Sequence, residues 1–193
     1  MTDFNILCDR LPDSVTVFGE KYPIKTDFRR WILMLDLFEQ CKNGNRYPLD
    51  VITAAKCAIH IVMPDNPDLC NLPAFKLVRL LEELAVFASG TVQQESGTEP
   101  GKRKDVQVFD FSCDAELILA SFRREYGIDL TTAGMHWWKF LALLRSLPSD
   151  SDFMRIVSLR LCDTTKIADD ELRRKLRRAK AAVRIKHKTG FDE

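Results

Sequence analysis

The chain has 193 residues, of which 46% are hydrophobic and 30% charged, and its formal net charge is +1. This balance is typical of a globular protein with one ordinary domain or two small ones, and we expect the chain to stay in a cytoplasm. No segment approaches the roughly 18 consecutive apolar residues that a membrane span needs. The N-terminus is acidic and has no basic segment, which argues against a signal peptide.

The segment "SVTVFGEKYPI" has the pattern of a β-hairpin. Val15 and Val17 alternate on one side of the first strand, and the chain turns at Gly19. A second strand then returns through Tyr22 and Ile24. Because a two-stranded ribbon is not stable alone, the hairpin must lie on the helices that follow it.

Three helices are expected next, each with apolar residues at helical spacing and a stop signal. The first follows Thr26 as its N-cap and ends at Gly44. The second begins at Pro48, and the third covers residues 72–87. The residues expected to face inward are Phe28, Trp31, Ile32, Leu35 and Phe38, then Val51, Ile52, Ala55, Ile59 and Val62, then Leu77, Leu80, Leu81, Leu84 and Phe87.

The composition changes at "ASGTVQQESGTEPGKRKD", which has one Val and no aromatic residue. Such a segment cannot bury enough apolar surface to offset the entropy of ordering. We interpret it as a flexible linker over residues 90–105, between an N-terminal region of residues 1–89 and a C-terminal helical region of residues 106–193. The expected fold class is mainly α, a helical bundle with a small N-terminal β-hairpin.

The C-terminal region opens with a short strand-like run at Val106 and Val108. A helix follows and ends at Gly127, a residue suited to a left-handed helix stop. Three further helices are expected. One lies between Gly127 and residue 152, one near residues 152–161 and one over residues 169–186.

That intervening helix contains "MHWWKFLALLRSLP" and is expected to run from a cap at Thr131 or Thr132 to Leu147, before Pro148. Apolar residues cover more than half of its circumference, which predicts a central helix with both tryptophans in the core. A catalytic role for His136 would need a partner within hydrogen-bond reach, and none lies within one turn of it.

Two binding roles for the tryptophans are also considered. Stacking on nucleic acid needs interleaved Lys and Arg, whereas these indoles lie among Leu and Ala. Alternatively, Trp137 or Trp138 stays exposed, rimmed by Lys139 and Arg145, as the anchor of a protein interface. The sequence leaves this second alternative open.

Six cysteines lie at wide spacings, which is not the pattern of a disulfide scaffold. The tightest group of ligand-type residues is Cys57, His60 and Cys70, and the second half of a zinc signature is missing. We expect no bound metal, no other cofactor and no enzymatic activity.

Residues 169–193 hold nine Lys or Arg against five Asp or Glu, so this tail has a net charge of +4 and the rest of the chain −3. The apolar seam of its helix consists of Leu172, Leu176, Ala179 and Val183. Three interpretations remain open: a solvated helix lying on the bundle by its seam, a helix that docks on an acidic or helical protein, and an arginine-rich binder of nucleic acid. For docking on a protein, which we favour over nucleic acid, the candidate contacts are Leu172, Leu176, Arg177 and Val183.

Three blocks carry a recognisable pattern: "VTVFGEKYPIKTDFRRWI" (15–32), "VFDFSCDAELILASFRREYGIDL" (108–130) and "MHWWKFLALLRSLPSDSDFMRIVSLRLCD" (135–163). They resemble the bacteriophage tail-region family known as gene product fifteen, found in phages and prophages of Gram-positive bacteria. The motif H-W-W followed by L-L-x-x-L-P is specific, and the resemblance covers nearly the whole chain. Residues 45–87 and the basic tail depart from the family pattern.

The resemblance implies a non-enzymatic factor of virion morphogenesis, because the family has no known catalytic residues. Its genes usually lie between those of the major tail protein and the tape-measure protein. This position implies a tail assembly chaperone that binds the tape-measure protein in the host cytoplasm before the tail tube polymerises. Other tail proteins are also possible partners, and a homo-oligomer is left open. The alternatives are a structural tail component and a nucleic-acid-binding regulator that uses the basic C-terminal helix.

Overall fold

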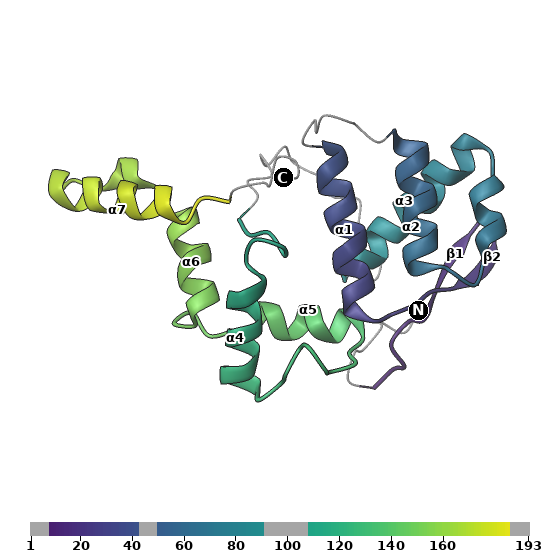
Figure 1. The fold of residues 1–193 in the computed structure, drawn as a ribbon, viewed down its shortest axis with the longest axis horizontal. Coiled ribbons are helices and arrows are strands. Elements are labelled where there is room, and N and C mark those ends of the chain that lie inside the picture. Colours follow the sequence, from purple (N-terminus) through teal and green to yellow (C-terminus); the bar gives the residue numbers. More distant parts are fainter. Residues whose placement is uncertain (1–7, 43–49, 91–107, 186–193) are drawn as a thin grey trace, which may run out of the picture. The chain divides into compact units, whose positions relative to one another are not determined.

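The computed structural model describes residues 8–42, 50–90 and 108–185, without the side chains of residues 40–42. The described chain is mainly helical with an N-terminal two-stranded antiparallel hairpin (Figure 1), which confirms the predicted fold class. The predicted linker, residues 90–105, lies almost entirely outside the described residues.

The chain divides into two compact units that do not follow sequence order. The first unit consists of Met1–Thr98 together with Gly134–Ala142, and the second of Glu99–Ala133 together with Leu143–Glu193. The sequence prediction placed all of residues 106–193 in one region. The grouping of Gly134–Ala142 with the first unit therefore differs from that prediction.

In the first unit, three helices form the body: α1 (Phe28–Lys42), α2 (Val51–Val62) and α3 (Ala74–Ser89), with a short 3-10 turn η1 (Pro67–Asn71) before α3. Helix α2 packs against both α1 and α3. Among the residues predicted to face inward, those that are buried are Phe28, Trp31, Ala55, Ile59, Val62, Leu77, Leu80, Leu84 and Phe87. The helical periodicity therefore located the core of this unit.

The hairpin consists of β1 (Ser14–Val17), which packs against α3, and β2 (Glu20–Pro23). Its two-residue turn is formed by Phe18 and Gly19, with φ angles of 54° and 80°. A turn with two positive φ angles matches the twist of the paired strands. Glycine adopts this conformation freely, whereas an aromatic residue is strained in it.

The start of α2 differs from the prediction. Asp50 is its N-cap, and the Asp50 carboxylate accepts the Thr53 N–H at 2.8 Å. Val51 is 58% exposed because it is the first residue after this cap, so its predicted inward position is wrong. The predicted start at Pro48 lies outside the described residues.

The start of α1 is also capped differently. The Asp27 carboxylate, rather than the Thr26 hydroxyl, lies at the cap and accepts the Arg29 N–H at 3.0 Å. The Thr26 carbonyl instead accepts the Trp137 N–H at 2.7 Å. Thr26 therefore belongs to a short extended pairing with the chain before α5.

Helix α5 (Trp137–Arg145) begins later than the predicted cap at Thr131 or Thr132. The residues before it are held in the same extended pairing, in which the Phe28 N–H donates to the Met135 carbonyl at 3.0 Å. Backbone groups that pair with another segment cannot also form the first helical turn. The helix therefore starts only after this pairing ends.

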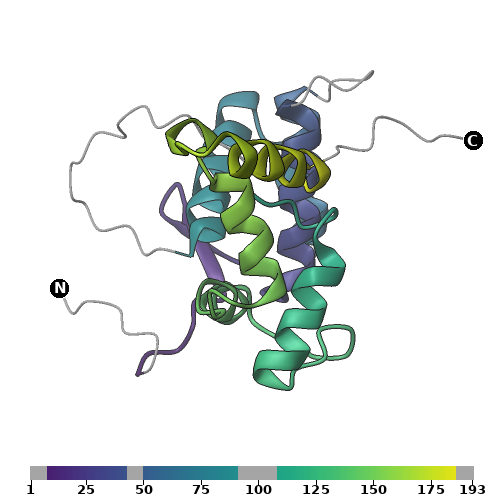
Figure 2. The same cartoon turned by 90° about the vertical axis from the view of Figure 1, so that its left-hand side faces the viewer.

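The second unit contains α4 (Ala115–Tyr126), α6 (Asp152–Leu161), a short 3-10 turn η2 (Thr164–Lys166) and α7 (Asp170–Ala182). Helix α6 packs on α4 and on α7, and the two ribbon views show α7 crossing the C-terminal end of α6 (Figures 1 and 2). Gly127, at φ 66°, ends α4 in the left-handed conformation, as predicted.

Candidate functional site

Two adjacent indoles of α5 bond the last turn of α3. The Trp137 Nε1–H donates to the Ala88 carbonyl and the Trp138 Nε1–H to the Phe87 carbonyl, both at 2.9 Å. Carbonyls in the last turn of a helix lack the usual donor four residues later, and these indoles supply donors there. The Phe87 carbonyl also accepts the Gly90 N–H at 3.1 Å. The two side chains are 1% and 6% exposed, which confirms the interpretation of this motif as core.

His136 occupies the N-cap position of α5. Its Nδ1 accepts the Trp138 N–H at 3.1 Å, and its Nε2 lies 2.9 Å from the Pro12 carbonyl. Because Nδ1 accepts a bond, the ring proton belongs on Nε2, which donates to Pro12. Burial lowers the pKa of His136, against the opposing effects of the Pro12 bond and the Asp13 charge. The neutral ring thus joins the segment before β1 to α5, which is a structural role.

Trp31 completes what we call the aromatic cluster, formed by Trp31, Phe87, His136, Trp137 and Trp138. Trp31 is fully buried, and its Nε1–H donates to a main-chain carbonyl just before α1 at 2.9 Å. Its ring centroid lies 4.5 Å from that of Phe87 and 6.4 Å from that of Trp137. The three indoles are therefore both enclosed and hydrogen-bonded.

The aromatic cluster bears on the predicted interface anchor. Neither Trp137 nor Trp138 presents an exposed indole, because both nitrogens bond carbonyls of α3 and both rings are enclosed. Arg145, the predicted rim residue, is exposed at the end of α5. A partner role for the two tryptophans thus finds no accessible surface in this unit.

Arg160 of α6 is the electrostatic centre of the second unit. Its two Nη atoms contact the Asp114 carboxylate at 2.6 and 2.8 Å, and the two side chains are 11% and 2% exposed. Its Nε–H donates to the Val183 carbonyl at 2.6 Å, and Nη1 also donates to the Val108 carbonyl at 3.2 Å. The bond to Asp114 raises the pKa of Arg160, although burial opposes the shift. One guanidinium thereby holds together the start of α4, α6 and the end of α7.

Sequence reasoning missed this ion pair. Asp114 resembles an ordinary residue at the start of a helix, and it lies 46 residues before Arg160. The one local signal is that Arg160 stands between Leu159 and Leu161 in a largely apolar stretch. That pattern indicates partial burial of the arginine but not which carboxylate meets it.

Helix α7 contacts the rest of the second unit through one flank, and none of its residues is buried. On that flank the Lys180 Nζ donates to the Cys162 carbonyl at 2.7 Å, and Arg173 donates to the Ile167 carbonyl at 3.2 Å. The helix is therefore held mainly by bonds from cationic side chains to main-chain carbonyls.

The predicted contact residues of α7 fall on two different sides of it. Leu176 and Val183 are partly buried on the flank that faces the unit. Leu172, one turn before Leu176 on the same seam, is 48% exposed, whereas Arg177 is exposed on the other side. The predicted helix over residues 169–186 ends at Ala182 in the structure.

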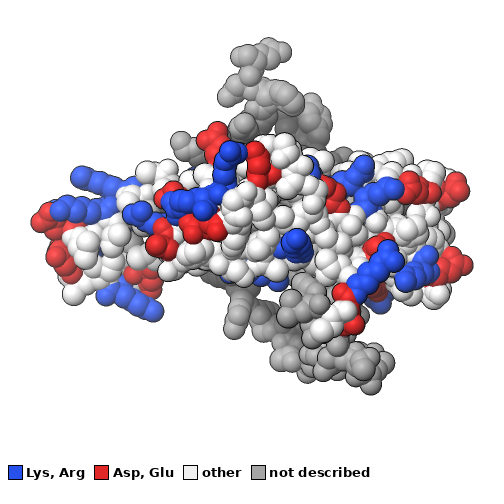
Figure 3. Space-filling view, turned by 90° about the horizontal axis from the view of Figure 1, so that it is seen from below, with Lys and Arg blue, Asp and Glu red and all other residues white. Residues whose placement is uncertain are grey.

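The side of α7 away from the unit is basic. Its exposed arginines are Arg174, Arg177 and Arg178; together with the exposed Arg184, just beyond the end of the helix, they form what we call the arginine face. Basic side chains gather at the left end of the view in Figure 3, where α7 lies, with acidic side chains among them.

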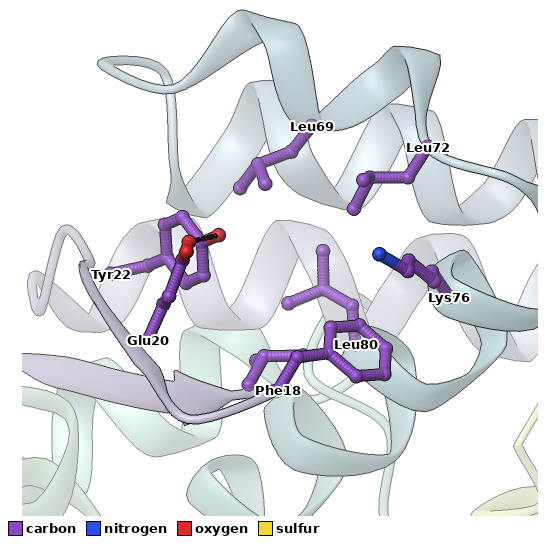
Figure 4. A pocket seen from close by; sticks show the side chains of 8 residues that line it. Phe18, Glu20, Tyr22, Leu69, Leu72, Lys76 and Leu80 are labelled. Atoms are coloured by element: carbon purple, nitrogen blue, oxygen red, sulfur yellow. Dashed lines mark hydrogen bonds between the residues drawn. The ribbon is translucent and has the colours of Figure 1, made fainter.

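A groove of about 180 Å³ lies between the hairpin and α3 in the first unit (Figure 4). Its lining consists of Val17, Phe18, Glu20, Tyr22, Leu69, Leu72, Lys76 and Leu80. The Lys76 ammonium lies 5.1 Å from the centroid of the half-exposed Phe18 ring. Tyr22 donates its hydroxyl to Glu20, and this bond raises the pKa of Tyr22. The groove thus mixes apolar side chains with the polar groups of Glu20, Tyr22 and Lys76.

Within the described ranges, no three His, Cys, Asp or Glu side chains lie close enough to hold a metal ion. The Cys70 Sγ lies 3.7 Å from the His60 Nε2, and Cys57 does not join them in a ligand set. None of the helices in this part of the chain is long and apolar enough to cross a membrane.

The fold and these surfaces define a mainly helical protein with an N-terminal hairpin, in which the His-Trp-Trp motif is part of the packed core. A family model described as Bacteriophage Gp15 protein matches residues 7–185, and the chain belongs to this bacteriophage family. No curated protein and no solved structure matches the chain. The resemblance based on three sequence blocks is thereby confirmed.

Proposed function

We propose that this phage protein is a tail assembly chaperone, a non-enzymatic factor that binds the tape-measure protein in the host cytoplasm before the tail tube polymerises. The observation that carries the proposal is membership of the Gp15 family over residues 7–185. The sequence resemblance adds the expectation that genes of this family lie beside the tape-measure gene.

Helix α7 is the element that we propose for client binding. It has no buried residue, and Leu172 on its apolar seam is 48% exposed. A helix presented in this way can lie along another helix without unfolding the unit that carries it. Many modest contacts also suit a factor that must later release its client.

Co-expression with the tape-measure protein tests the proposal. We expect the client to be soluble and to co-purify with the wild-type chain, and both effects to be lost with the variant Leu172→Asp/Arg177→Glu. Leu33→Asp is the matched control, because Leu33 is an equally accessible leucine, 58% exposed, on α1. A wild-type chain that gives neither a complex nor a gain in client solubility contradicts the proposal.

Mass spectrometry of purified virions separates this proposal from the alternative of a structural tail component. A chaperone leaves before the tail is complete, so we expect no peptide of this chain in the particles. Detection of the chain in amounts comparable to the tail proteins would instead support the structural role.

A further inference from the structure

The arginine face of α7 has a regular geometry. Arg174, Arg177 and Arg178 span about 6 Å of helix, and Arg184 follows two residues after Ala182, the last residue of α7. At 3.6 residues per turn, the side chains of the three helical arginines fall within an arc of about 100°. The partly buried Leu176 and Val183 lie on the other side. The three helical arginines therefore share one side of α7, and Arg184 follows at its C-terminal end.

The arginine face differs from the other cations of the same helix. Arg173 pairs with Asp170, Lys175 with Glu171, and Lys180 with a main-chain carbonyl. The four arginines make no side-chain hydrogen bond or ion pair within the described part of the chain. Cations of α7 that serve the fold thus have partners in the fold, and those on the arginine face do not.

A solvated helix does not need this arrangement. Arg174 is followed by like charges three and four residues later, and such pairs destabilise an isolated helix. A helix kept only for solubility would gain from carboxylates at these positions, as it does at Glu171. The uncompensated arginine face is therefore better suited to a surface whose negative charges come from outside the chain.

We propose that the arginine face binds an acidic helical segment of a protein partner. Glutamates three, four and seven residues apart on a partner helix repeat at the spacing of these arginines, and each guanidinium can hold one carboxylate through two parallel bonds. This inference rests on the proposed function, because it gives the chemistry of the client segment that α7 would meet. It assigns the contact to the arginine face rather than to the apolar seam.

Nucleic acid is the less favourable occupant. Helix α7 has no aromatic residue on which a base could stack. The whole chain also has a net charge of only +1, whereas nucleic-acid-binding domains are usually strongly basic.

The inference is tested with a synthetic helical peptide of 21 residues that carries glutamates at every third or fourth position on one face. We expect the full-length chain to bind it, and the variant Arg174→Gln/Arg177→Gln/Arg178→Gln/Arg184→Gln to bind about tenfold more weakly or worse, as four weak ion pairs would give. The matched control, Lys21→Gln/Lys56→Gln/Lys139→Gln/Arg155→Gln, removes the same charge from exposed positions elsewhere and should keep the wild-type affinity within about twofold.

Three results would overturn the inference: equal binding of the peptide with glutamine in place of glutamate, an equal loss in the control variant, or tighter binding of a 20-base-pair DNA or RNA duplex than of the acidic peptide. The co-expression experiment is independent of these. A complex with the tape-measure protein that survives the loss of all four arginines would leave the chaperone proposal standing and refute the arginine face as its contact. Peptide binding without a tape-measure complex would support the arginine face as a binding surface and contradict the tape-measure protein as its client.

Discussion

The aromatic cluster and helix α7 are both tied to their units through main-chain carbonyls, yet the two regions are opposites in burial. In the aromatic cluster, neutral indole N–H groups bond the end of α3 from positions that are 1% and 6% exposed. In α7, the bonds come from the partly exposed cations Arg173 and Lys180 and from Arg160, and no residue of the helix is buried.

This difference separates a fixed region from a releasable one. A buried carbonyl that loses its indole donor has no water to replace it, so the free energy of unfolding falls by the full penalty of an unpaired buried group. A partly exposed carbonyl that loses a lysine can bond water instead. The most conspicuous motif of the sequence therefore secures the fold, while the plain basic helix is the accessible surface.

The largest effect is expected at Trp137. Trp137→Ala removes a buried ring and leaves the Ala88 carbonyl without its donor, which should cost about 3–5 kcal/mol of unfolding free energy. Chemical denaturation followed by the fluorescence of Trp31 and Trp138 measures the loss in the first unit. Trp137→Phe keeps most of the ring and should cost clearly less. A loss below about 1 kcal/mol for the alanine variant would contradict the role of the cluster as core.

Breaking the Arg160–Asp114 pair should come next. Arg160→Met leaves a carboxylate that is 2% exposed without its partner, which should cost about 3 kcal/mol. It also removes the donor to the Val183 carbonyl, so the last turn of α7 should lose protection in hydrogen exchange.

The three tryptophans of the chain all belong to the first unit, which gives this variant an internal control. Arg160→Met should lower the stability seen by far-ultraviolet circular dichroism and leave the tryptophan transition nearly unchanged. Arg155→Met, at an exposed position of α6, should change neither. An unaltered exchange pattern at the end of α7 would show that Arg160 does not hold it.

These two regions also show what the sequence could and could not predict. Gly127 ends α4 as expected because a left-handed stop is a local property of one residue. The place of Trp137 depends on a carbonyl 49 residues away, for which no local pattern exists. Thr131 has the chemistry of an N-cap, but the Asp129 carboxylate bonds its N–H and hydroxyl in a turn of its own.

For helix α7, too, one part could be predicted from the sequence and another could not. Periodicity gave the apolar seam of α7, including Leu176, because the spacing of one helix is sufficient for that. It could not show that the flank with Lys180 would face the unit, since this orientation depends on the Cys162 carbonyl. It could not show either that the arginine face would be turned away from the unit.

His136 should give the aromatic cluster a pH dependence. Its pKa is lowered by burial, so the folded state favours the neutral ring. The resulting stability is complete above the unfolded pKa of about 6.5 and declines as the pH falls through that value toward the lowered one. The loss should approach that of one N-cap bond, about 1 kcal/mol, because a protonated Nδ1 cannot accept the Trp138 N–H.

Tryptophan-detected unfolding between pH 8 and pH 5 measures this effect. His136→Asn keeps a capping oxygen without a titratable ring and should flatten the profile in this range. His60→Asn, at an exposed position of α2, should leave the profile as it is. The carboxyl groups whose pKa values are lowered by hydrogen bonds from Thr131 and Thr165, Asp129 and Asp163, lose their contribution only at more acidic pH, so they do not obscure it.

The smallest effect is expected at the arginine face. Replacing Arg174, Arg177, Arg178 and Arg184 together by Gln should change the unfolding free energy by no more than about 0.5 kcal/mol, because these exposed side chains bond nothing in the described chain. At low salt the sign should be stabilising, since like charges on one helix are removed, and added salt should erase the difference. Chemical denaturation followed by far-ultraviolet circular dichroism, at two salt concentrations, measures this change in unfolding free energy. A loss of more than about 1 kcal/mol of unfolding free energy would mean that these arginines stabilise the fold. It would contradict the contrast between a fixed aromatic cluster and an accessible basic helix.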